Sequence, residues 1–183
     1  MTREAAIGVG RSAYLQSKVT VLFGLVGLQT LLLVGIVLTF RPLHDTVLAY
    51  VLVGAGVLLT GFAAVAMGLV ISALVRSQDQ ATSLVPLVLI PQLFFAGAII
   101  PVAKMSAVTK VVAAFVFARW SYAEVGSAVD MNARFAASPK SGGGATYGVH
   151  FFSLSPALGL AILVLFTIAF VLVTRLLLRR GGE

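Results

Sequence analysis

The charged residues of this chain are separated by long uncharged stretches. Four stretches contain no Asp, Glu, Lys or Arg: Val19–Phe40, Thr46–Val75, Gln80–Ala103 and Ser141–Thr174. Each can supply the roughly 20 apolar residues that a helix needs to cross a bilayer. Hydrophobic residues make up 60% of the chain and charged residues only 10%, with a mean hydropathy of +1.07, whereas soluble domains carry roughly 25% charged residues. The sequence therefore predicts an all-α integral membrane protein.

About four transmembrane helices are expected, over residues 15–40, 46–75, 80–102 and 156–178. The last helix is expected to begin at Pro156, because the preceding residues are polar and Gly-rich and proline is favoured in a first helical turn. Outside these spans we predict an amphipathic cytoplasmic N-terminal helix over residues 1–14. Residues 103–155 are predicted to form an external re-entrant or interfacial helical segment followed by a loop.

Glycines recur in the second predicted span, where they favour close approach of neighbouring helices. These are Gly54, Gly56, Gly61 and Gly68. A pore-lining role for the same residues is the weaker interpretation, because small residues are the ordinary contacts between membrane helices.

The net charge of +7 and the pI near 10.4 come from short flanks and one long connection. This distribution favours phospholipid head groups as the acidic partner and gives no support to a nucleic-acid role. The first twenty residues carry four charges and do not resemble a cleavable signal peptide. On the side of the membrane that holds both termini, Lys and Arg crowd the helix ends, whereas on the other side most of them are spread over one long connection. Because Lys and Arg near helix ends favour the cytoplasmic side, both termini are predicted to be cytoplasmic. The chain contains no cysteine.

The third predicted span contains proline at three positions, although proline lacks a backbone donor and resists helix continuation. Broken helices are tolerated in lipid where protein or a water-filled cavity surrounds them. We therefore predict helix breaks at Pro86, Pro91 and Pro101, with Gly97 as a flexible point. Plain kinked packing and a cavity-lining role remain equal alternatives on these features alone.

After Pro101 the chain becomes amphipathic, and its longest apolar run, residues 111–118, is too short to span a membrane. We expect a re-entrant or interfacial helix with Trp120 and Tyr122 at the level of the head groups. Its charged residues are Lys104, Lys110, Arg119, Glu124 and Asp130. Residues 138–148 read as a flexible loop.

Three segments together resemble a known family. The first has the pattern of a Glu, a Gly, an aromatic residue and then a Lys that enters a span, at Glu4, Gly8, Tyr14 and Lys18. The second segment is LFFAGAIIPVAKM, and the third is FARWSYAEVGSAV. In this order they resemble the membrane domain of ABC-2-type exporters, close to the ABCG subfamily. The three segments correspond to the family's cytoplasmic coupling helix, its fifth span and its external re-entrant segment.

The resemblance implies roles for particular residues. Arg3, Glu4, Gly8 and Arg11 would contact an ATP-binding domain and transmit its closure. One part of the fifth span would line a central cavity between two protomers and form an apolar plug; its residues are Leu89, Leu93, Phe94, Phe95, Gly97, Ala98 and Ile99. ATP and Mg would be bound by the nucleotide-binding domain, with no catalytic residue, metal site or cofactor in this chain. A homodimer surrounded by membrane lipids is expected.

The chain departs from the family in extent. The resemblance begins just before the third of six family spans, and the Walker A and signature motifs of the ATPase do not occur. We interpret the sequence as a fragment of a longer half-transporter, with a shortened permease as the alternative. Its Ala-, Val- and Gly-heavy composition is typical of a high-GC bacterium such as an actinobacterium, and the bacterial plasma membrane is the expected location.

The resemblance favours the permease part of an ATP-driven exporter that works by alternating access on a lipid, glycolipid or hydrophobic drug. The alternative is a channel or scaffold that uses no ATP. An intramembrane enzyme ranks last, because it needs placed nucleophiles, acids or metal ligands and the predicted spans contain no carboxylate, no Cys and no His. His44 and His150 are both expected in external loops.

Overall fold

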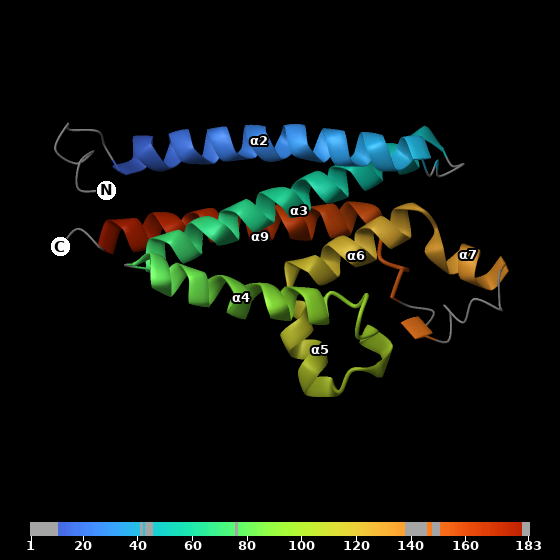
Figure 1. Cartoon of the computed structure of the whole chain (residues 1–183). Helices are drawn as coiled ribbons and strands as arrows, with labels where there is room; N and C mark the ends of the chain where they lie inside the picture. The colour runs from blue at the N-terminus through green and yellow to red at the C-terminus, as the bar shows by residue number, and fades with distance from the viewer. Residues whose placement is uncertain are drawn as a thin grey trace.

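Three long helices form the main bundle of the protein (Figure 1). The structure is a computed structural model that describes residues 11–40, 42, 46–75, 77–137, 146–147 and 151–180. The long helices are α2 (Arg11–Phe40), α3 (Val47–Leu74) and α9 (Pro156–Arg180). Within the described residues, these three helices are long and apolar enough to cross a membrane. The start of α2 and the end of α9 lie at the same end of the bundle (Figure 1).

The most extensive contact in the bundle is between α3 and α9. Small residues of α3, namely Ala49, Gly56, Ala63 and Ala66, are buried, and small side chains allow two helix backbones to approach closely. Ala63 and Met67 of α3 meet Leu163 of α9 in one apolar cluster. Of the four glycines in the second predicted span, Gly56 lies against Glu124 and Gly61 against Val26, whereas a Cβ added at Gly54 or Gly68 would meet nothing within 4 Å.

Helix α2 is held along one side only. Of its side chains from Gln16 onward, Thr30 alone is buried. Its main ring contact is a parallel stack of Phe23 on Phe62 of α3, with the ring centroids 4.3 Å apart. Close to this stack, Val26 lies against Gly61. The rest of the α2 surface is covered by exposed leucine, isoleucine and valine side chains, as expected for a helix in lipid.

Helix α4 (Gln78–Phe95) is shorter than the predicted span over residues 80–102. Pro86 and Pro91 lie inside the helix, so the predicted breaks at these two positions are wrong. A proline inside a helix removes one hydrogen bond and kinks the axis, while the other bonds of the helix can continue. The helix instead ends before Gly97, whose φ of 101° lies in a region that glycine adopts readily. Pro101 caps a 3₁₀ turn, η1 (Val102–Lys104), and so lies at the predicted break.

After η1 the chain forms three short helices, α5 (Ala107–Ala114), α6 (Phe117–Ala128) and α7 (Met131–Ala137). Helix α6 packs against both α3 and α9 (Figure 1). We call the space that it occupies between these two helices the α6 groove. Phe117, Ala123, Glu124 and Gly126 of α6 are buried. Protein therefore covers one face of α6, and the expectation of a re-entrant or interfacial helix stays a prediction.

Candidate functional site

The residues expected to contact an ATP-binding domain fall at the edge of the described structure. Arg3, Glu4 and Gly8 lie outside the described residues, as do His44 and His150. Arg11 is the first residue of α2, and its side chain is not among those described. Their predicted contact with an ATPase therefore stays a prediction.

The residues predicted to form a cavity wall and plug do not share one environment. Leu89, Leu93 and Phe94 on α4 are 51%, 60% and 41% exposed, and no residue of α4 is buried. Phe95 instead packs against a small apolar cluster formed by Val102, Met105 and Ala113. The structure thus separates an uncovered apolar face on α4 from a packed region around η1 and α5.

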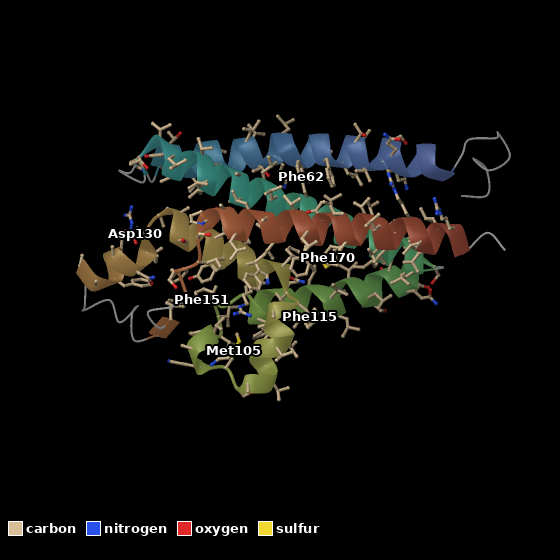
Figure 2. All side chains as sticks on the ribbon, turned by 180° about the vertical axis from the view of Figure 1, so that it is seen from behind. Phe62, Met105, Phe115, Asp130, Phe151 and Phe170 are labelled. Atoms are coloured by element: carbon tan, nitrogen blue, oxygen red, sulfur yellow. The ribbon has the colours of Figure 1, made fainter. Side chains whose placement is uncertain are left out.

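The short stretch after α4 is split in the same way. Gly97 is buried, and a Cβ atom added there would lie 2.9 Å from the Phe151 ring. Ala98 and Ile99 are exposed, and the Tyr147 hydroxyl donates to the carbonyl of Ala98 at 3.4 Å. Phe151 and Met105, labelled in Figure 2, both belong to the packed region. A glycine is therefore required at position 97, where the chain turns in close contact with Phe151. The side chains of Ala98 and Ile99 are exposed on the protein surface.

Gln92 connects α4 to the helices beside it and was not singled out in the sequence. Its side-chain oxygen accepts from the backbone N–H of Ala118 at 3.2 Å, in the first turn of α6. Its amide nitrogen lies 4.0 Å from the sulfur of Met67 on α3. The first N–H groups of a helix have no partner within the helix, so Gln92 satisfies one of them across an inter-helix contact. A polar residue directly after Pro91 in an apolar stretch was the available signal.

We expect Gln92→Leu to lower the free energy of unfolding by roughly 1–2 kcal/mol, because it leaves the Ala118 N–H without its acceptor. Thermal unfolding can be followed through Trp120, the only tryptophan in the chain. Gln29→Leu, at an exposed position on α2, is the matched control and should change stability by less than about 0.5 kcal/mol. Equal shifts for the two variants would remove Gln92 from this role.

The polar contacts of the α6 groove are built from hydroxyl groups. Thr60 of α3 donates to the carbonyl of Gly56 at 2.6 Å, and its oxygen lies 2.5 Å from the hydroxyl of Ser121 on α6. At the far end of α6, Ser127 donates to the carbonyl of Leu154, just before α9 begins. These bonds fix both the depth and the rotation of α6 in the groove.

Glu124 is the only acidic residue in α6 and lies in the middle of this groove. Its side chain is 0% exposed, and among the described residues neither carboxyl oxygen has a hydrogen-bond partner. It fits between Gly56 of α3 and Gly159 of α9. The amphipathic pattern of the sequence predicted a charge at the membrane surface and missed this burial; the small residues on either side of Glu124 gave no decisive signal.

A cavity of about 610 Å³ opens on the other side of α6, between η1, α5 and the segment that leads into α9. Two of its lining residues, Lys110 and Arg119, are cationic, and Trp120 and Tyr147 are aromatic. The Arg119 guanidinium lies 5.1 Å from the centre of the Trp120 ring, and burial lowers the pKa of Arg119. The Trp120 N–H donates to the carbonyl of Ala114 at 2.8 Å. An apolar cavity with cations at its wall suits the polar end of an amphipathic molecule better than a cationic solute.

Metal chemistry finds no support in the described part of the chain, where no three His, Cys, Asp or Glu side chains are grouped closely enough to hold an ion. The site therefore consists of an apolar face on α4, a polar link at Gln92, and α6 packed in its groove. Such an arrangement offers apolar surface to a bound molecule.

Comparison with known proteins agrees with this arrangement. The family model described as ABC-2 type transporter matches residues 1–129, which include α2, α3, α4, α5 and α6. No curated protein and no solved structure matched the chain. With most of its length matched by the family model, the chain belongs to the ABC-2 type transporter family and is the membrane-embedded permease part of an ABC transporter.

Proposed function

We propose that the chain forms part of an ATP-driven exporter that moves a hydrophobic or amphipathic molecule, such as a lipid, glycolipid or drug, by alternating access. The observation that carries this proposal is the uncovered face of α4. Leu89, Leu93 and Phe94 are exposed there, and α4 has no charged residue after Asp79 in its first turn.

The chemistry of this face argues for the substrate class. An apolar wall without charges binds apolar surface favourably, and it offers no partner to a small, highly charged solute, which is costly to place inside a membrane. The cavity of the protein that Lys110 and Arg119 line adds cationic groups to this apolar surface. A substrate with an apolar body and a polar or anionic end would match both features.

The partners follow from the family and from the uncovered face. Membrane domains of this kind pair with a nucleotide-binding subunit, which would bind ATP and Mg, and Arg3, Glu4, Gly8 and Arg11 are the residues proposed to contact it. A second copy of the chain, forming a homodimer, would place two α4 faces around one central cavity in a bilayer of membrane lipids. The start of α2 and the end of α9 lie at one end of the bundle (Figure 1). Because Lys and Arg are densest beside the helix ends on the side of the termini, both termini are proposed to be cytoplasmic, in a bacterial plasma membrane.

The test is the ATPase rate of complexes purified from native membranes through a C-terminal tag on this chain. We expect ATPase activity to co-purify, to rise when lipids or apolar drugs are added, and to fall several-fold in Glu4→Ala, because the loss of this carboxylate weakens contact with the ATPase. Small charged solutes should not stimulate the rate.

Glu183→Ala is the control, since it removes a carboxylate at the other end of the chain. A folded complex without any associated ATPase would replace this proposal with a channel or scaffold. An ATPase that responds equally to both variants would retain the exporter and remove Glu4 from the contact.

A further inference from the structure

The carboxyl group of Glu124 is enclosed by uncharged groups. It is 0% exposed, and its two oxygens have no hydrogen-bond partner among the described residues. The hydroxyls of Thr60 and Ser121 in the groove are bonded to each other, and that of Ser127 donates to the carbonyl of Leu154. A carboxyl group that loses water without gaining partners favours its neutral form strongly.

Two glycines on different helices provide the space for this side chain. A Cβ atom at Gly56 would overlap Oε2 of Glu124, and a Cβ atom at Gly159 would lie 2.6 Å from the Glu124 Cβ and 2.7 Å from its Cγ. Gly54, one helical half-turn away on α3, has nothing within 4 Å of the same added atom. The α6 groove is therefore shaped around a side chain of this size.

In the part of the chain that the structure describes, no opposite charge faces the carboxyl group from the elements packed around it. Helix α3 has no charged residue, and its only titratable side chain, Tyr50, lies about 9 Å along the axis from Gly56. The first charged residue of α9, Arg175, lies about 24 Å along the axis from Gly159. These distances leave both helices without a countercharge for Glu124.

The remaining charged and titratable groups of α6 and its neighbours point elsewhere. On α6 itself, Arg119 lies over Trp120, and Tyr122 packs in a ring cluster with Tyr147 and Phe151. From α5, Lys110 lines the cavity on the opposite side of α6. After α6, Asp130 is exposed, and from α7 Arg134 donates to the carbonyl of Val129 at 2.8 Å. On α4, Asp79 lies in the first turn, at the end away from α6.

From this geometry we propose that Glu124 is a proton-binding site: the chain holds one proton there when α6 occupies its groove, and loss of that proton favours the departure of α6. The ligand is the proton itself, because the Glu124 side chain fills the space beside the two glycines. The inference holds whether or not the chain exports an apolar molecule. Its consequence is that the position of α6 responds to pH.

The sign of the pH effect follows from the direction of the pKa change. Burial raises the pKa of Glu124 from 4.5 to about 7, so the folded state binds more protons than the unfolded state between these two values. The stability that this proton supplies is fully present below about pH 4.5 and is lost as the pH rises towards 7, after which it is constant. Acid therefore favours α6 in its groove.

Infrared spectroscopy of the purified, folded full chain in lipid nanodiscs tests proton binding directly. We expect a carbonyl stretching band of a protonated carboxyl group that disappears as the pH is raised through about 7 and that is missing in Glu124→Gln. Asp130→Asn is the control and should leave the band unchanged. Wild-type protein without a titrating band, or a band that survives Glu124→Gln, would overturn the proposal, and so would a Glu124→Gln protein that fails to fold, because the amide has the shape of the neutral acid.

The movement of α6 needs a second measurement, for which the absence of native cysteine is convenient. Ser121→Cys places a thiol at the α3 contact, and its labelling by a maleimide is compared with and without Glu124→Gln at the same pH. The ratio of the two rates cancels the pH dependence of the thiol itself. We expect the labelling rate of Ser121→Cys, divided by that of the double variant Ser121→Cys with Glu124→Gln, to rise at least about threefold between roughly pH 6 and pH 8. A constant ratio would show that proton loss does not release α6.

Discussion

Gly159→Val is expected to expel α6 from its groove and to lower the free energy of unfolding by about 3 kcal/mol or more, at the upper end of overpacking effects. The added Cβ would lie 2.6 Å from the Cβ of Glu124 and 3.4 Å from its backbone Cα. Rotation of the Glu124 side chain moves neither atom far, so the whole of α6 must shift. The thermal unfolding midpoint, followed by Trp120 fluorescence, measures the loss.

Gly54→Val is the matched control for this substitution. It adds the same β-branched side chain to a membrane helix, but nothing lies within 4 Å of its Cβ. We expect a change of less than about 1 kcal/mol, from helix propensity alone. A similar loss of stability in both variants would show that valine is harmful in these helices generally and that the Glu124 contact is not the cause.

Phe117→Ala is expected to cost about 3–5 kcal/mol, the range for removing a buried phenylalanine. Phe117 is 4% exposed and joins α6 to the cluster of Ala63, Met67 and Leu163. Its ring makes an edge contact with Phe170 of α9, the centroids being 6.3 Å apart. Chemical or thermal unfolding of both proteins in one detergent measures the difference in the free energy of unfolding between variant and wild type.

Phe115→Ala provides a control two residues away. Phe115 lies at the turn between α5 and α6 (Figure 2) and is 75% exposed. The same atoms are removed, but few protein contacts are lost, so the change should stay within about 0.5 kcal/mol. If Phe115→Ala were as harmful as Phe117→Ala, the burial of α6 against α3 and α9 would not be what holds it.

The helices α2, α3 and α9 could be predicted from charge alone, because lipid excludes charged side chains and each of these helices runs through an uncharged stretch. The fourth uncharged stretch, Gln80–Ala103, was predicted as a span in the same way, but α4 ends within it at Phe95. Thr46 illustrates how sharp such a boundary is: it directly follows the sequence RPLHD, and its hydroxyl oxygen accepts from the N–H of Ala49 to cap α3. The family membership followed from ordered motifs rather than from physics. Both kinds of signal are local in the sequence.

The errors arose where contacts between distant residues decide the structure. Pro86 and Pro91 favour a break locally, yet the helix continues through them and ends at Phe95. The burial of Glu124 depends on Gly56 and Gly159, which lie 68 and 35 positions away in the chain. The acceptor role of Gln92 likewise depends on where α6 begins. Periodicity and charge patterns contain no information on such pairings.

The one-sided packing of α2 has a consequence for assembly. In lipid there is no hydrophobic gain when two apolar helices meet, so association rests on the fit between surfaces. The fit of α2 to α3 is concentrated at the Phe23–Phe62 stack and the Val26–Gly61 contact, whereas α3, α6 and α9 bury side chains in one another. Among the three long helices, α2 is thus the one whose protein contacts can be exchanged for lipid, or for another polypeptide, at the smallest cost to the rest of the fold.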